Sequence, residues 1–125
     1  MAICLVAGAV LVHLEAAIFT LAWLHSVEHV RWEEDWRVVD GRLIPVESRI
    51  KGSGAGMEPP AEAVLADGYW HYRPQVAPLE RIDLARSGMV ADWQLCIGGK
   101  CRDLTTYLPA DAPTSVPVTV RACSG

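Results

Sequence analysis

Apolar and polar residues alternate along much of this chain with a period of two. In residues 10–15, Val10, Val12 and Leu14 fall on one side of an extended segment, and His13 and Glu15 fall on the other. Such alternation is typical of a half-buried β-strand. Short runs of this kind, separated by turn signals, predict strands over residues 3–6, 10–14, 19–28, 35–39, 42–51, 69–73, 81–85, 92–104 (as a hairpin) and 118–122. With no long helical period, the pattern predicts an all-β fold, a single-domain antiparallel β-sandwich or partly open barrel.

The segment 42–51 alternates most clearly. It follows Asp40-Gly41, a pair that predicts a tight hairpin when it lies between two apolar runs. We predict that three apolar side chains of the segment point inward and that three charged ones point outward. These are Ile44, Val46 and Ile50 (inward) and Glu47, Arg49 and Lys51 (outward).

Residues 52–68 break the alternation. Glycines are frequent there, Pro59-Pro60 cannot continue a hydrogen-bonded ladder, and residues 61–65 are predicted to form at most one helical turn. The sequence therefore predicts one long Gly/Pro-rich loop, a length that usually accompanies function or mobility.

The apolar run 2–24 resembles a membrane helix or a secretory signal in composition. However, no Lys or Arg precedes it, and His13 and Glu15 lie at its centre, where charge is costly in a membrane. We therefore predict strands for this run, and we identify no export signal in this chain.

The composition indicates one domain spanning residues 1–125, because 51% of the residues are hydrophobic and 21% are charged. The net charge of -4 and the absence of a dense Lys/Arg cluster argue against a nucleic-acid partner.

The four cysteines include one informative pair. A two-residue turn at Gly98-Gly99 places Cys96 opposite Cys101 at a non-hydrogen-bonded rung, where a disulfide can close. Cys4 and Cys123 are then paired by elimination only. Four reduced, buried cysteines are the alternative. A zinc site is not expected, because Cys-x4-Cys has no second close pair.

A polar cluster follows the apolar run 19–24. His25, Glu28, His29 and Glu33 are residue types that bind first-row metal ions, but on an extended strand the two histidines lie too far apart to share one ion. Their alternative role is as ordinary polar residues at a strand end. A catalytic role for Ser26, activated by His25 or His71, is disfavoured, because adjacent strand residues point to opposite faces and no Gly-x-Ser-x-Gly elbow is present. The residues of this cluster that we retain as candidate ligand-binding residues are His25, Ser26, Glu28 and Glu33.

A second candidate site is a glycine loop, Gly52-Ser53-Gly54-Ala55-Gly56, preceded by Arg49 and Lys51. Consecutive backbone N–H groups of such a loop can bind a carboxylate or phosphate, and the two cations would attract it. The loop lacks the Gly-Lys-Ser/Thr of a nucleotide-binding loop, and a plain flexible connector is the alternative. We expect the polar cluster and the glycine loop to share one rim of the fold.

Residues 20–36 and 49–60, which contain His25-Ser26-Val27-Glu28 and the glycine loop, resemble the small bacterial proteins of domain-of-unknown-function family 1850. Members are often encoded beside TAXI-type TRAP transporters for organic acids. The resemblance implies a role associated with such a transporter and a periplasmic or membrane-associated location.

Together these observations favour a non-enzymatic accessory or small-anion-binding domain. Its expected partners are TRAP transporter subunits and a small organic anion, and no cofactor is expected. The alternative is a metal-dependent or hydrolytic enzyme that uses His25 and Glu28.

Overall fold

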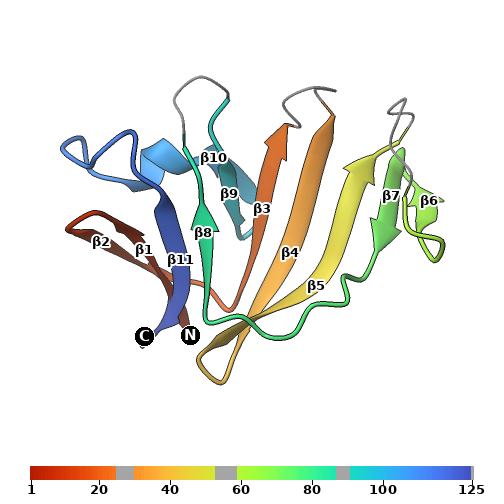
Figure 1. Ribbon diagram of the computed structural model, residues 1–125, viewed down its shortest axis with the longest axis horizontal. Coiled ribbons are helices and arrows are strands. Elements are labelled where there is room, and N and C mark those ends of the chain that lie inside the picture. The colour runs from red at the N-terminus through yellow and green to blue at the C-terminus, as the bar shows by residue number, and fades with distance from the viewer. Residues whose placement is uncertain (25–29, 53–58, 87–90, 125) are drawn as a thin grey trace.

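The computed structural model describes residues 1–24, 30–52, 59–86 and 91–124. The chain folds into two antiparallel sheets, shown in Figure 1. Sheet A has the order β2-β1-β11-β8, and sheet B has the order β10-β9-β3-β4-β5-β7-β6. The elements are β1 (Ala2–Ala7), β2 (Val10–Glu15), β3 (Ile18–Leu24), β4 (Arg31–Val39), β5 (Arg42–Lys51), β6 (Val64–Ala66), β7 (Tyr69–Tyr72), β8 (Arg81–Leu84), β9 (Gln94–Ile97), β10 (Lys100–Asp103), the 3-10 helix η1 (Leu104–Tyr107) and β11 (Val118–Cys123). The predicted all-β fold is confirmed, and it is a sandwich.

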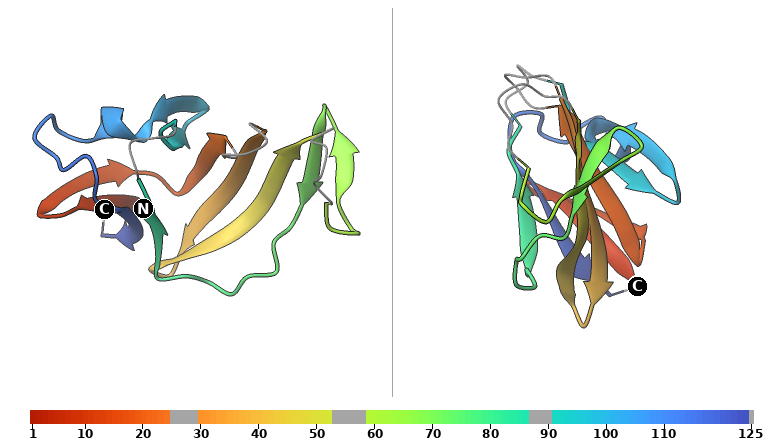
Figure 2. Two further views of the ribbon diagram at one scale, coloured as in Figure 1. Left: turned by 45° about the horizontal axis from the view of Figure 1, so that its top comes forward. Right: turned by 90° about the vertical axis from the view of Figure 1, so that its right-hand side faces the viewer.

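The core lies between the two sheets. Sheet A contributes Ile3, Leu5 and Val120, and sheet B contributes Phe19 and Leu21, all at most 1% exposed. Sheet B is wider than sheet A, and Figures 1 and 2 show that β5, β7 and β6 extend sideways beyond sheet A. One face of sheet B therefore covers the core, and the opposite face, called here the outer face, is turned away from sheet A.

The apolar N-terminal run forms three strands, as predicted. β1 and β2 pair from Ala2↔Glu15 to Ala7↔Val10, and the turn between them contains Gly8 with a φ of 60°. No helix in the part of the chain that the structure describes is long and apolar enough to cross a membrane.

The inward orientation predicted for Ile44 and Val46 is wrong. The buried residues of this part of β5 are Leu43 and Pro45, whereas Ile44 and Val46 stay partly exposed. The cause is a β-bulge: Asp35 pairs with Glu47 and Trp36 with Pro45, which leaves Val46 without an opposite residue. The extra residue reverses which positions face the core on its two sides. Beyond the bulge Ile50 is buried as predicted, and Arg49 lies on the outer face.

Two predicted boundaries are also wrong. β4 begins at Arg31, four residues before the predicted start, because its first residues pair with the end of β3. Residues 64–66, assigned to the irregular loop, form the edge strand β6. A tight turn at Asp67-Gly68, with φ values of 55° and 80°, joins β6 to β7.

Both disulfides are formed. Cys96 pairs with Cys101 across the β9–β10 hairpin, which confirms the pairing predicted from the Gly98-Gly99 turn. Cys4 and Cys123 join β1 to β11. The predicted alternative with four reduced cysteines is therefore not found.

Candidate functional site

A row of charged side chains crosses the outer face of sheet B. The strand register places Glu33 of β4 opposite Arg49 of β5, and Arg49 opposite His71 of β7. Asp35 and Glu47 form the neighbouring rung, because β4 and β5 pair there as well. We call Arg31, Glu33, Asp35, Glu47, Arg49 and His71 the charged row.

Arg49 lies at the centre of the charged row and contacts three carboxylates. Its Nε donates to Glu33 at 2.8 Å, and its Nη1 and Nη2 donate to the two oxygens of Asp35 at 2.6 and 2.7 Å. Nη1 also donates to Glu47 at 3.0 Å. A guanidinium has five N–H hydrogens, so these four bonds leave one N–H of Arg49 without an acceptor among the described residues.

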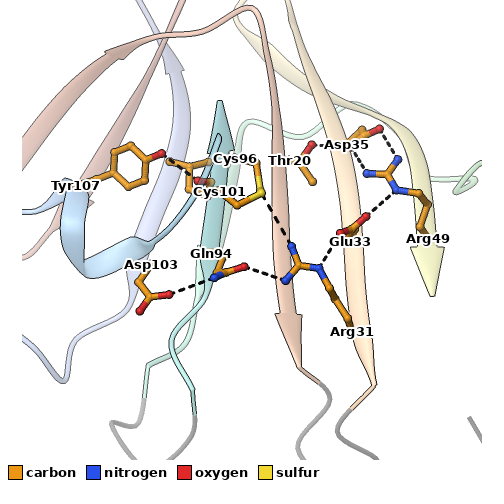
Figure 3. Close-up of a disulfide and its surroundings, with 11 residues drawn as sticks. Thr20, Arg31, Glu33, Asp35, Arg49, Gln94, Cys96, Cys101, Asp103 and Tyr107 are labelled. Carbon is orange, nitrogen blue, oxygen red and sulfur yellow. Dashed lines mark hydrogen bonds and ion pairs between the residues drawn. A yellow bond between two sulfur atoms is a disulfide. The ribbon is translucent and has the colours of Figure 1, made fainter. Parts of the chain in front are cut away.

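Arg31 extends the charged row towards the β9–β10 hairpin, as Figure 3 shows. Its Nε donates to Glu33 at 2.7 Å and its Nη1 to Gln94 at 2.8 Å. Its Nη2 lies 4.0 Å from the sulfur of Cys101. Glu33 therefore joins the two arginines, one on each of its oxygens.

His71 closes the other end of the charged row. Its Nδ1 lies 2.7 Å from Glu47 and its Nε2 lies 3.1 Å from the carbonyl oxygen of Ala66. Both partners can only accept a hydrogen bond, so both are satisfied only when the ring carries two protons. The hydrogen bond to Glu47, in agreement, raises the pKa of His71 above its usual value.

The charged row is held in its ionised form. Partial burial alone raises the pKa of Glu33, Asp35 and Glu47, but hydrogen bonds and charges from the cations outweigh burial, and the pKa of each carboxyl group is lowered. Hydrogen bonding, above all to Asp35, raises the pKa of Arg49. With His71 protonated, three carboxylates face three cations, so the row is electrically neutral.

Beside the charged row lies a pocket of about 540 Å³, called here the outer-face pocket. It is lined by residues 17–20, by Glu33 and Arg49, and by Cys96, Gly98, Gly99 and Cys101. In Figure 3, Thr20 lies between the Cys96–Cys101 disulfide and the pair formed by Arg49 and Asp35. The Thr20 hydroxyl donates to Asp35 at 2.6 Å, so its oxygen remains able to accept a hydrogen bond.

The structure brings two of the predicted ligand-binding residues, Glu33 and Arg49, into direct contact. Lys51 is exposed at the end of β5, and the N–H of Gly52 donates to the carbonyl oxygen of Gly68 at 2.7 Å. The other predicted residues lie outside the described residues, as does the shared rim that they would form. They are His25, Ser26, Glu28, Ser53 and Gly54, and His29 of the polar cluster also lies outside the described residues.

Sequence reasoning missed Thr20, Arg31, Asp35, Glu47 and His71 as site residues. The available signal was the period-two spacing of Arg31, Glu33 and Asp35, which places all three on one strand face. Among the described residues, no group of three or more His, Cys, Asp or Glu is arranged to hold a metal ion.

The chain was compared with curated proteins, solved structures and protein families. No curated protein and no solved structure matches it, but one family does. The model of the family described as "Domain of unknown function (DUF1850)" matches residues 19–104, which include every residue of the charged row. This match covers more than half of the chain, and the protein therefore belongs to the DUF1850 family.

Proposed function

We propose that this protein is a non-enzymatic binding domain that holds a small organic anion in the outer-face pocket and works with a TRAP-type organic-acid transporter. The observation that carries the proposal is the pocket itself, in which Arg49 and Thr20 lie beside apolar walls. A volume of about 540 Å³ is within the range typical of small-molecule sites.

The polar groups of the pocket suit a carboxylate. One N–H of Arg49 has no acceptor among the described residues, and the side chain is fixed in place by Glu33, Asp35 and Glu47, so little side-chain entropy is lost when a ligand binds. With His71 protonated, the charged row carries no net charge and does not repel an anion at long range. A charge-assisted hydrogen bond from Arg49 then supplies orientation rather than high affinity.

The apolar groups suit a short carbon chain. Ile18 is 55% exposed and lies at the pocket wall, and the disulfide forms part of the same lining. Gly98 and Gly99 also line the pocket, and a Cβ at either would contact nothing within 4 Å, so no side chain crowds the hairpin turn. A mixed lining of this kind fits an organic acid better than an inorganic ion.

The association with a transporter rests on the family resemblance. Two disulfides support a location in an oxidising compartment, such as the periplasm. The alternative of an enzyme depends on His25 and Glu28, which lie outside the described residues.

Titration calorimetry with succinate, and with neutral succinamide as its matched control, tests the ligand. The variant Ile18→Trp fills the pocket, and Leu11→Trp is its control, because Leu11 is similarly exposed at 53% on the edge strand β2 of the other sheet. We expect saturable heat with succinate only, an affinity at least about tenfold lower in Ile18→Trp, and no change in Leu11→Trp. Equal affinity in both variants, or no heat with any C2–C6 carboxylate, would contradict the proposal.

The partner is tested separately. Immobilised protein is incubated with detergent-solubilised TRAP transporter subunits. The Leu11→Trp variant, which is altered on the exposed edge strand of sheet A, is tested in the same way. Retention of the subunits in stoichiometric amount is the expected result. Their complete recovery in the wash would remove the transporter from the proposal and leave ligand binding to be judged on its own.

A further inference from the structure

The two disulfides lie in very different surroundings. Cys4 and Cys123 belong to β1 and β11, the two interior strands of sheet A, and Cys4 is only 3% exposed. Cys101 is exposed on β10, an edge strand whose four residues are all exposed and which pairs only with β9. Cys96 is 8% exposed, and Cys123 at the end of β11 is partly exposed. Of the four sulfurs, that of Cys101 is therefore the easiest for a thiol from solution to reach.

A cation lies next to the exposed sulfur. The guanidinium of Arg31 is fixed by Glu33 and Gln94, and its Nη2 lies 4.0 Å from the sulfur of Cys101. A nearby cation stabilises a thiolate relative to a thiol. Thiolates are the leaving groups and nucleophiles of thiol–disulfide exchange, so this arrangement favours opening of the bond. Exposed disulfides are, as a class, the labile ones.

From this geometry we propose that the Cys96–Cys101 disulfide is a thiol-exchange site, which a dithiol reductant opens while the Cys4–Cys123 disulfide stays closed. The inference is independent of the ligand proposed above.

The chemistry balances in two steps. A thiolate of the dithiol attacks the sulfur of Cys101, the Cys96–Cys101 bond breaks, and Cys96 leaves as a thiolate that takes up a proton. The second thiolate of the reductant then attacks the reductant sulfur in the mixed disulfide, and Cys101 leaves as a thiolate beside Arg31. The protein disulfide gains two electrons and the dithiol is oxidised to a cyclic disulfide.

Opening this bond changes the outer-face pocket. Cys96, Gly98, Gly99 and Cys101 form one wall of the pocket, and the disulfide is a covalent cross-link between β9 and the edge strand β10 in addition to the turn that joins them. Without it, β10 keeps the Gly98-Gly99 turn and its ladder pairing with β9 but loses the cross-link between Cys96 and Cys101. The wall of the pocket is therefore looser in the reduced protein.

The test uses the full chain in native buffer without ligand. The protein is treated with dithiothreitol for a series of times, quenched with acid, alkylated, and mapped by mass spectrometry. We expect Cys96 and Cys101 to be alkylated at least about tenfold faster than Cys4 and Cys123. Equal rates for the two pairs, or faster reduction of Cys4–Cys123, would overturn the proposal.

Two further measurements examine the mechanism. Arg31→Gln should slow alkylation of reduced Cys101 at pH 7 by about threefold or more, and its pH profile should move upward. The control is Arg102→Gln, an exposed arginine next to Cys101 that points to the other face of β10. Hydrogen exchange should rise on reduction in residues 94–103 and stay unchanged in β1 and β11. Identical pH profiles for the two arginine variants would refute the proposal that Arg31 stabilises the Cys101 thiolate. Unchanged hydrogen exchange in residues 94–103 would refute the proposal that reduction loosens the pocket wall.

Discussion

The substitution Arg49→Met examines the charged row at its centre. Methionine keeps much of the side-chain volume but removes the charge and all four hydrogen bonds to Glu33, Asp35 and Glu47. The three carboxylates then face one another with only Arg31 and His71 left to balance them. Because like charges at close range raise each other's pKa, the variant is destabilised most where all three are ionised.

The magnitude follows from the exposure of the groups. Removing one partner of a fully buried ion pair costs about 3–5 kcal/mol, whereas exposed pairs contribute about 0–1 kcal/mol. Arg49 is 19% exposed and its partners are 19–38% exposed, so the row lies between these limits. We therefore expect Arg49→Met to lower the free energy of unfolding by about 2–3 kcal/mol at pH 7.

The pH dependence has a definite sign. In the parent protein the lowered pKa values of Glu33, Asp35 and Glu47 contribute stability above the unfolded-state pKa, and this contribution is lost as the pH falls through the folded-state pKa. We expect the pKa of each of these carboxyl groups to be higher in the variant than in the parent, so acid relieves the repulsion. The stability difference between parent and variant should therefore shrink between pH 7 and about pH 3.5.

Urea denaturation of the oxidised protein at several pH values measures this difference, and Arg37→Met is the control. Arg37 is exposed on the same face of β4 and should change the free energy of unfolding by at most about 0.5 kcal/mol. A loss below about 0.5 kcal/mol in Arg49→Met, or a loss that does not change with pH, would refute this account of the charged row.

Three other predictions follow from single features. The pKa of His71 is raised in the folded protein, so protonated His71 stabilises the fold fully below its unfolded-state pKa. This stabilisation is lost as the pH rises through the folded-state pKa. Thermal denaturation across pH 5–9 should show the loss in the parent and not in His71→Asn. Gly98→Ala should lower the free energy of unfolding by about 1–2 kcal/mol, because φ is 62° there although nothing lies within 4 Å; an unchanged urea midpoint would contradict it. The double variant Cys4→Ser/Cys123→Ser should lose about 4–5 kcal/mol, since the disulfide closes a loop with a sequence separation of 119; calorimetry showing a loss below about 1 kcal/mol would contradict this.

The features of the fold that could be predicted from the sequence are those that depend only on residues close together along the chain. The alternation of residues 10–14 requires only that successive side chains point to opposite faces, and the Cys96–Cys101 pairing requires only a two-residue turn. The bulge at Val46 could not be predicted in this way, because it appears only when β5 is paired with β4.

The candidate site depends on long-range register. Glu33, Arg49 and His71 are far apart in the sequence, and only the pairing of β4, β5 and β7 places them opposite one another. Each of these strands has several registers that its own hydrophobic pattern allows in steps of two. The charged row therefore could not be assembled from the sequence, although the spacing of Arg31, Glu33 and Asp35 indicated its face.

The central claim is that the outer-face pocket binds a small organic anion, and a nuclear magnetic resonance titration of ¹⁵N-labelled protein with succinate tests it most directly. We expect saturable shifts of the Thr20, Gly98 and Gly99 amides and of the Arg49 Nε–H, because all four residues line the pocket. Succinamide should leave these signals in place. Unchanged signals at saturating succinate, or saturable shifts confined to residues outside the pocket, would contradict the claim.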